Sequence, residues 1–269
     1  MRPAASVLAD EIVRAARRQG AARALILDLD GTLAPITERR RDARVPAATL
    51  NALGRLLDDG WRVAIVTGRP VADARRMMPL QGVTLFGSHG IERSTPHIVP
   101  RRLRAIAVRA ASIARQASLW IRAFRGVEVE RKPFGFALHH RTLEATARPR
   151  FRRRLRAWLA GRDLRGLELH RGKRILELRP AGLGKGLVAR RWPAARRARR
   201  GDHSLVAIGD DRTDEDLFTA LAGRGLTVRV GPPRRATFAV RRLSGAAAVA
   251  RLLTTLAAAG AVERRHARG

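Results

Sequence analysis

The chain has 269 residues, no cysteine and a formal net charge of +32 at pH 7. This length suits one large domain or a core with a smaller inserted domain, and the lack of cysteine excludes disulfides, thiolate metal sites and thiol nucleophiles. No apolar run reaches the roughly 18 residues of a membrane-spanning helix and the N-terminus lacks a signal-peptide pattern, so we expect a cytoplasmic protein without a membrane partner.

The first third of the chain alternates apolar strands with amphipathic helices. The order strand, helix, strand predicts a parallel pair with a right-handed crossover, in which both strands end at the same edge of the sheet. The expected elements are a helical arm over residues 1–22, strands over 24–28, 61–69 and 83–87, and helices over 46–60 and 70–79.

Beyond Pro100 the pattern changes to neighbouring strands joined by tight turns. Such a pattern predicts an antiparallel sheet with helices on one face, and thus an α+β module inserted into an α/β chain. The α/β alternation returns at residue 182, and we expect the last ten residues to be loose. The expected elements are helices over 101–124 and 149–160 with strands over 126–132, 134–141, 167–172 and 173–180, then a helix after 182–186, strands over 204–211 and 226–230, and helices over 213–222 and 244–259.

Arginine carries almost all of the basic charge. Only three of the 55 basic residues are lysines: Lys132, Lys173 and Lys185. Arginine is spread along nearly every segment, and no block alternates basic with aromatic residues of the kind that stacks on bases. This skew is typical of a GC-rich genome, so we expect solvated helix faces rather than a nucleic-acid partner. The three lysines then mark places where a compact ammonium is required.

Two of the expected strands end in paired carboxylates. Residues i and i+2 of a strand point the same way, so Asp28 and Asp30 crowd one side of the chain, where like charges repel unless a cation lies between them or one is protonated. Asp210 and Asp211 follow another buried strand, and no helix cap is expected to account for them. Open α/β sheets bind ligands outside the carboxyl ends of their strands, so these acids predict a site at that edge.

Thr67 and Lys185 are expected at the same edge, and the combination suits phosphoryl transfer through an aspartyl phosphate. A carboxylate attacks phosphorus, a hard divalent cation such as Mg²⁺ neutralises charge, and a lysine and a hydroxyl bind the phosphate oxygens. A second acid moves the protons. A single Asp-x-Asp is more often an acidic turn, so the prediction depends on the four polar clusters together.

The segments DLDGT, TGR, GLGKG and GDDRTDED, in that order, resemble the four motifs of the haloacid dehalogenase (HAD) superfamily of phosphatases. The resemblance implies a Rossmann-like core with a mostly parallel sheet over residues 1–98 and 181–269, and an α+β cap over 99–180. It also implies Asp28 as nucleophile, Asp30 as general acid/base, and Thr67 and Lys185 as phosphate binders. The Mg²⁺ ligands it implies, some of them through water or the backbone, are Asp28, Asp30, Asp210, Asp211 and Asp214.

Three further segments resemble signatures of trehalose-6-phosphate phosphatases: GSHGIER (87–93), KPFGFALHHR (132–141) and GKRILELRP (172–180). This resemblance covers residues 24–255, with Thr67 in place of the commoner serine and His140 in place of a tyrosine. It implies trehalose 6-phosphate as the substrate. Separately, we expect the chain to be a monomer. The substrate-binding residues that the resemblance implies are Gly68, Arg69, His89, Gly90, Glu92, Lys132, Arg141, Lys173 and Glu177.

Structural roles remain alternatives for several of these residues. Arg69 either contacts the phosphate or pairs with neighbouring acids, and Glu177 with Lys173 either holds sugar hydroxyls or forms a cross-strand pair. The same choice is open for His89 and Glu92, while His139 or His140 could pack against an aromatic ring. For the whole chain, the alternatives are another HAD sugar or glycerate phosphatase and a basic nucleic-acid-binding protein on the same fold.

Overall fold

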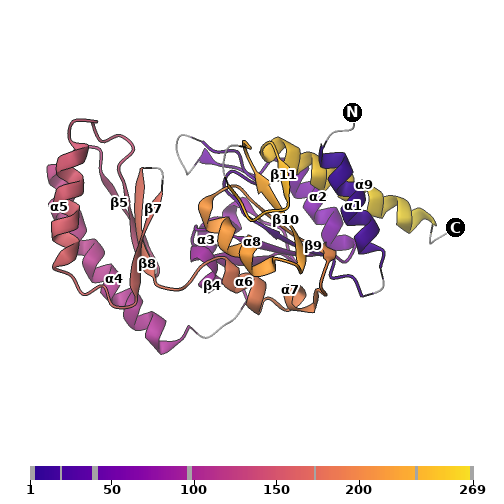
Figure 1. Cartoon of the computed structure of the whole chain (residues 1–269), viewed down its shortest axis with the longest axis horizontal. Helices are drawn as coiled ribbons and strands as arrows, with labels where there is room; N and C mark the ends of the chain where they lie inside the picture. The colour runs from indigo at the N-terminus through magenta and orange to yellow at the C-terminus, as the bar shows by residue number, and fades with distance from the viewer. Residues whose placement is uncertain are drawn as a thin grey trace. The chain divides into compact units, whose positions relative to one another are not determined.

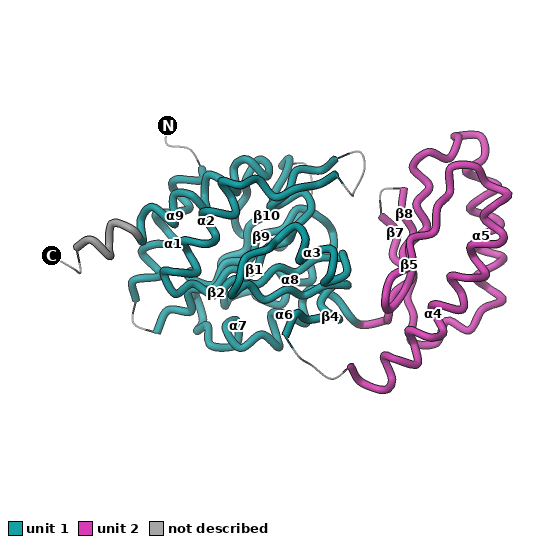
Figure 2. Tube along the Cα trace, turned by 180° about the vertical axis from the view of Figure 1, so that it is seen from behind, with its two compact units in different colours: residues 1–96, 183–269 teal, residues 97–182 magenta. Residues whose placement is uncertain are grey.

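The computed structural model describes residues 4–18, 20–37, 42–95, 99–172, 174–233 and 236–266. The chain forms two compact units (Figure 2). We call residues 1–96 with 183–269 the core unit, and residues 97–182 the inserted unit. These boundaries differ by two residues from those expected from the sequence.

The core unit is built on a seven-stranded sheet in the order β11-β10-β9-β1-β2-β3-β4 (Figure 1). All neighbouring strands run parallel except β3 and β4. The edge strands β4 and β11 have only two and three residues, too few to show an apolar pattern, and were not expected. The strands are β1 (Ala24–Leu27), β2 (Arg62–Val66), β3 (Thr84–Gly87), β4 (Glu92–Arg93), β9 (Asp202–Gly209), β10 (Gly225–Val230) and β11 (Arg241–Leu243).

Helices cover both faces of this sheet, which explains why its central strands are apolar throughout instead of alternating. One apolar cluster joins one face to α1 (Ala4–Ala16), α2 (Ala47–Asp58), α3 (Val71–Met77) and α9 (Ala246–His266). A second cluster joins the other face to α6 (Gly186–Arg191), α7 (Pro193–Arg197) and α8 (Glu215–Leu221). The register is level across the centre, because Leu27 pairs with Ile65 on one side and Ile208 on the other.

Two expectations for the helices were wrong. One helix was expected after the segment 182–186, but Pro193 separates α6 from α7, because proline cannot donate the backbone hydrogen bond of a helix interior. The last ten residues were expected to be loose, but α9 continues to His266, and residues 267–269 lie outside the described residues. The last ten residues of α9 include four alanines and two arginines, which favour helix.

The inserted unit is a four-stranded antiparallel sheet in the order β5-β6-β8-β7, with helices packed on one face. Its strands are β5 (Glu128–Lys132), β6 (Gly135–His139), β7 (Leu167–Gly172) and β8 (Ile175–Pro180), and its helices are α4 (Arg101–Trp120), η3 (Ile121–Ala123) and α5 (Arg148–Ala160). Both long helices lie on the same side of the sheet (Figure 1). Phe136, Leu138 and Leu178 point from the sheet into the shared core, so the alternate strand residues form the opposite, polar face.

No helix within the described ranges combines the length and apolar composition that crossing a membrane requires.

Candidate active site

The carboxyl ends of the central strands bring Asp28 and Asp210 together. Asp28 follows β1 and donates its backbone N–H to the carbonyl of Ile208 at 2.9 Å, and Asp210 follows β9 directly. Because the two strands are parallel and in register, their first residues beyond the sheet lie side by side. The predicted meeting of these acids at one sheet edge follows from this register.

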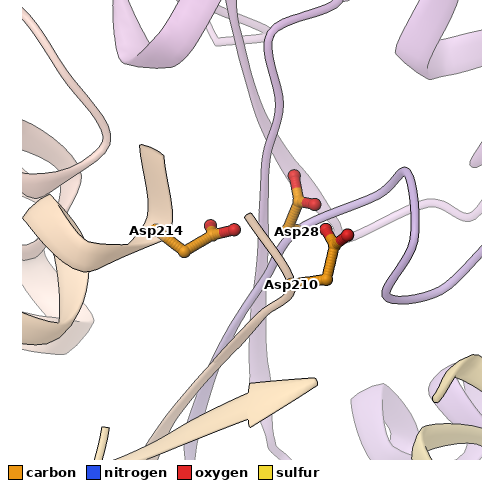
Figure 3. A group of neighbouring side chains, drawn as sticks. All are labelled: Asp28, Asp210 and Asp214. Atoms are coloured by element: carbon orange, nitrogen blue, oxygen red, sulfur yellow. The ribbon is translucent and has the colours of Figure 1, made fainter. Parts of the chain in front are cut away.

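Three carboxylates form a compact cluster at this edge. Asp28, Asp210 and Asp214 each offer an oxygen atom, and these atoms all lie within 4.8 Å of one another (Figure 3). Asp28 is 5% exposed and Asp214 is fully buried. The Oδ1 atom of Asp210 is also buried, and it has no hydrogen-bond partner among the described residues. Such a set of hard oxygen donors fits Mg²⁺.

Burial of several negative charges in one place changes their titration. Burial raises the pKa of Asp28 well above its ordinary value, and the charge of Lys185 opposes that shift. Burial, followed by the charges of Asp214 and Asp211, raises the pKa of Asp210 to about 6. The cluster therefore holds more negative charge than the protein itself neutralises.

Lys185 supplies the one ammonium that contacts this cluster among the described residues. Its Nζ donates to Oδ1 of Asp28 at 2.6 Å and to Oδ1 of Asp214 at 2.8 Å, and its side chain is 2% exposed. Burial lowers the pKa of Lys185, but the charges of Asp214 and Asp28 outweigh it and hold the pKa well above its ordinary value. The lysine thus stays charged beside Asp28.

Arg69 pairs with Asp30. Its Nε donates to Oδ2 of Asp30 at 2.8 Å and its Nη2 donates to Oδ1, so both carboxylate oxygens are engaged. The guanidinium side chain is 7% exposed. The backbone N–H of Arg69 also donates to Oγ1 of Thr67 at 3.2 Å. Of the two roles considered for Arg69, pairing with a neighbouring acid is present in this structure.

Asp211 caps the short helix η4 (Arg212–Asp214). Its Oδ1 accepts from the backbone N–H of Thr213 at 2.6 Å, and Oδ2 of Asp214 accepts in return from the backbone N–H of Asp211 at 3.0 Å. The expectation that no helix cap accounts for Asp211 was therefore wrong. The capping-box spacing Asp-x-x-Asp was the signal in the sequence. Asp211 and Asp30 both lie outside the three-carboxylate cluster.

The segment 88–92 is hydrogen-bonded to the segment 67–71. The N–H of Ser88 donates to the carbonyl of Arg69, and the N–H of His89 donates to the carbonyl of Thr67. Glu92 accepts from the N–H of Val71 at 3.3 Å and from the hydroxyl of Ser88. Glu92 thus has a structural role in holding the two segments together.

Two glycines allow this close packing. A Cβ on Gly68 would lie 2.7 Å from Cε1 of His89, so the imidazole covers the Gly68 backbone. Gly90 has φ +96° and lies against α6, where a Cβ would be 3.2 Å from Cγ2 of Val188. The predicted residues Gly68, His89 and Gly90 therefore belong to one packed layer of the core unit.

Lys132 and Glu177 form an ion pair on the polar face of the inserted sheet. The Nζ of Lys132 lies 2.5 Å from Oε1 of Glu177, and the two side chains are 6% and 13% exposed. They come from β5 and β8, which are separated by β6, where the intervening residues Gly135 and Ala137 are small. Lys132 can therefore reach across β6.

The structural alternative for Glu177 was a cross-strand ion pair with Lys173. The lysine that contacts Glu177 among the described residues is Lys132. Lys173 lies outside the described residues. Arg141 is exposed, and its carbonyl accepts from Nη1 of Arg174 at 3.0 Å.

Other polar side-chain pairs on this polar face were not anticipated. His139 contacts Glu130 at 2.8 Å, and Glu168 contacts both His170 at 2.6 Å and Arg179 at 3.4 Å. The alternation of polar residues along the strands predicts that these side chains share one face of the sheet. Which of them form pairs depends on the strand order, which the sequence does not give.

His140 points the other way and packs on Phe151, with ring centroids 5.5 Å apart. Burial, together with nearby arginines, lowers the pKa of His140, so this imidazole favours its neutral form. Of the alternatives left open for His139 and His140, packing against an aromatic ring is present for His140.

The chain matches known proteins over most of its length. The family model described as trehalose-phosphatase matches residues 26–235. A trehalose-phosphate phosphatase of Mycobacterium tuberculosis (strain H37Rv) is 33% identical over 246 residues, which cover 87% of this chain and 61% of that protein. A probable trehalose-phosphate phosphatase of Sinorhizobium fredii is 32% identical over 247 residues, covering 87% of each. The chain thus spans about three fifths of the mycobacterial relative (61%).

Solved structures show the same fold. A trehalose-6-phosphate phosphatase related protein superposes with a TM-score of 0.73 at 26% identity, covering 89% of this chain and 99% of that one. A phosphatase of the HAD superfamily from Bacteroides thetaiotaomicron superposes with a TM-score of 0.58 at 18% identity, covering 91% and 97%. The expected fold class is confirmed: a Rossmann-like α/β core with a mostly parallel sheet and an additional domain.

Proposed function

The chain belongs to the trehalose-phosphatase family, and from this premise we propose that it hydrolyses trehalose 6-phosphate to trehalose and inorganic phosphate. The observation that carries the proposal is the buried contact of Asp28 with Lys185 beside Asp210 and Asp214. Together they make a carboxylate nucleophile, a phosphate-binding cation and a set of metal ligands.

Asp28 is the proposed nucleophile. One of its oxygens attacks phosphorus while the bond between phosphorus and the sugar O6 breaks, which leaves the phosphoryl group on Asp28. Water then attacks the same phosphorus, the bond to the Asp28 oxygen breaks, and phosphate leaves. The charge of Lys185 opposes the rise in the Asp28 pKa that burial causes, which favours the ionised nucleophile, and its N–H groups can donate to the phosphoryl oxygens.

Asp30 is the proposed general acid/base. It gives a proton to the O6 alkoxide as it leaves, and later takes a proton from the attacking water, so its own protonation is restored. Arg69 donates to both Asp30 oxygens in this structure, so the transferred proton has to use the second lone pair of one oxygen or replace one of these hydrogen bonds. Arg69 would then position Asp30, and the Thr67 hydroxyl would bind the phosphate.

Asp28, Asp210 and Asp214 would hold Mg²⁺, with the Asp30 carbonyl and Asp211 as the further ligands expected from the sequence. The ion would supply positive charge to the phosphate and to the crowded carboxylates. The donor set fits the ion, because two buried carboxylates and one half-buried carboxylate lie together beside a single ammonium.

The substrate's sugar hydroxyls would be held by charged side chains, which make stronger hydrogen bonds than neutral ones. On the inserted unit, the buried Lys132–Glu177 pair carries this part of the proposal. The proposed substrate-binding residues are Lys132, Arg141, Lys173 and Glu177 on the inserted unit and Gly68, Arg69, His89, Gly90 and Glu92 on the core unit.

The test is phosphate release in the presence of Mg²⁺ from trehalose 6-phosphate, glucose 6-phosphate, sucrose 6-phosphate, mannosyl-3-phosphoglycerate and p-nitrophenyl phosphate. We expect the highest kcat/KM with trehalose 6-phosphate. Weak activity on all five would support the chemistry of the core unit and exclude the proposed substrate. Preference for another sugar phosphate would identify a different phosphatase of the same superfamily.

A further inference from the structure

The positive charge of the chain is concentrated in the inserted unit. Residues 97–182 contain 22 lysines and arginines and 6 aspartates and glutamates, a net charge of +16. This unit therefore carries half of the +32 of the whole chain in about a third of its residues. A compositional bias of the genome would act on both units alike, so it does not account for this difference.

Within the inserted unit, the charge lies on the outer face of two packed helices. α4 and α5 together contain eleven arginines and no acidic residue. The two helices contact each other through aromatic rings, with the Trp120 and Phe151 centroids 5.9 Å apart, and cover the same face of the sheet (Figure 2). We call the exposed arginines of these helices the basic helical face: Arg101, Arg102, Arg104, Arg115, Arg150, Arg152, Arg153, Arg154 and Arg156.

Arg150 lies over the Phe124 ring, 5.9 Å from its centroid, but the stability of the fold does not explain the face as a whole. Arg150 with Arg153 and Arg152 with Arg156 are like charges at spacings of three and four, which destabilise a helix. Both helices also begin with arginines and have no acid in the first turn, the unfavourable sign for the helix dipole. None of the nine arginines forms a salt bridge with an acid of the described residues. An external anion would remove this repulsion.

We propose that the basic helical face binds the phosphate backbone of duplex nucleic acid without reading its sequence. Guanidinium groups match phosphate geometry with two parallel hydrogen bonds. The 20 residues of α4 extend over about 30 Å, and a duplex carries one negative charge per about 1.7 Å of that length. Three arginines lie in the first turn of α4 and Arg115 lies about three turns further along, so phosphates of one duplex can meet positive charge at both positions.

The aromatic residues favour a duplex over a single strand. Trp120, Phe124, Phe151 and Trp158 pack on one another in the core beneath the helices, so they are engaged there and do not form a platform for unpaired bases. An anionic membrane is less favoured, because the large apolar side chains exposed on these helices are two isolated ones, Val108 and Leu119. Binding here leaves the polar face of the sheet, with Lys132 and Glu177, open, so this proposal does not rest on the proposed phosphatase activity.

The experiment measures binding of the full chain to a fluorescein-labelled 24-base-pair duplex by anisotropy at increasing salt. A variant with Arg104, Arg115, Arg153 and Arg156 replaced by glutamine removes the centre of the basic helical face. The matched control replaces four exposed arginines of α6 and α7 in the core unit, Arg190, Arg191, Arg196 and Arg197, by glutamine. Both variants lose the same charge.

We expect the wild-type affinity to fall steeply with salt, and the slope of log K against log salt to decrease by about 3 to 4 in the α4/α5 variant, since each lost phosphate contact removes about 0.9. The core-unit control should change the slope by less than about 1. Equal losses in both variants would mean that binding follows net charge alone, and would overturn the proposal.

Absence of wild-type binding at about 0.1 M salt, where the Debye length is about 10 Å, would also overturn it. Stronger retention on vesicles of phosphatidylserine and phosphatidylcholine than on the duplex would assign the face to a membrane surface and exclude nucleic acid. Circular dichroism and the rate of phosphate release should match wild type in both variants, which separates lost binding from lost folding.

Discussion

The acidic cluster of the core unit and the polar face of the inserted sheet both bury charged side chains, but they balance the charge differently. In the core unit, Asp28, Asp210 and Asp214 share one ammonium, that of Lys185. In the inserted unit, the ammonium of Lys132 pairs with the carboxylate of Glu177. An excess of buried negative charge indicates where a cation and a phosphate interact, whereas a balanced pair suits neutral hydroxyls.

The largest effect in this comparison is expected from Asp28→Asn. Turnover should fall by about 10⁴-fold or more, because the amide cannot accept the phosphoryl group. Folding stability should stay the same or rise, because one of the repelling carboxylates is removed. Phosphate release and thermal melting measure the two effects. Retained turnover would remove Asp28 as nucleophile.

Lys185→Met should change stability in the opposite direction. It leaves the three carboxylates without their ammonium, and removing one partner of a buried ion pair costs about 3–5 kcal/mol. Turnover should also be lost. Denaturant unfolding with and without Mg²⁺ measures the change. Lys132→Met in the inserted unit is the comparison, and it should destabilise less, because it removes an ammonium contact from one carboxylate, whereas Lys185 contacts two. Equal destabilisation would contradict the charge-imbalance argument.

The same comparison shows how far the sequence predicted the structure. Apolar runs that end in Asp28 and Asp210 were sufficient to place both residues at one sheet edge, because parallel strands in register end together. The pairing of Lys132 with Glu177 could not be predicted, because it depends on the strand order β5-β6-β8-β7, and strand alternation fixes only the face of each residue. The ion pair of Arg69 with Asp30 likewise depends on the side-chain rotamer that Arg69 adopts in the folded state.

A more selective loss is expected from Glu177→Ala. Removing a charged hydrogen-bond acceptor from the sugar costs about 1.5–3 kcal/mol, so kcat/KM for trehalose 6-phosphate should fall about tenfold to a hundredfold. The rate with p-nitrophenyl phosphate, which has no sugar, should change little. Glu130→Ala is the matched control, since Glu130 lies on the same sheet face and pairs with His139 but is outside the proposed sugar set. Equal losses on both substrates would mean that Glu177 is only structural.

The smallest expected effect is a change in folding stability with pH in the protein without Mg²⁺. The pKa of Asp210 determines whether stability rises or falls with pH. Its pKa in the folded chain is about 6, against an ordinary value of 3.8, so protonation favours the folded state. That contribution is complete below pH 3.8 and is lost as pH rises through about 6. With EDTA, Tm should therefore fall between pH 5 and pH 7.5.

Mg²⁺ should reverse this fall, because the ion takes over the neutralisation that the proton provides at low pH. The increase in Tm on adding Mg²⁺ should be larger at pH 7.5 than at pH 5, where protons compete for the same oxygens. Asp210→Asn should reduce both the pH dependence and the Mg²⁺ effect. An EDTA-treated protein whose Tm rises from pH 5 to pH 7.5 would show that the three carboxylates do not repel one another in the folded chain, and the comparison with the balanced Lys132–Glu177 pair would then fail.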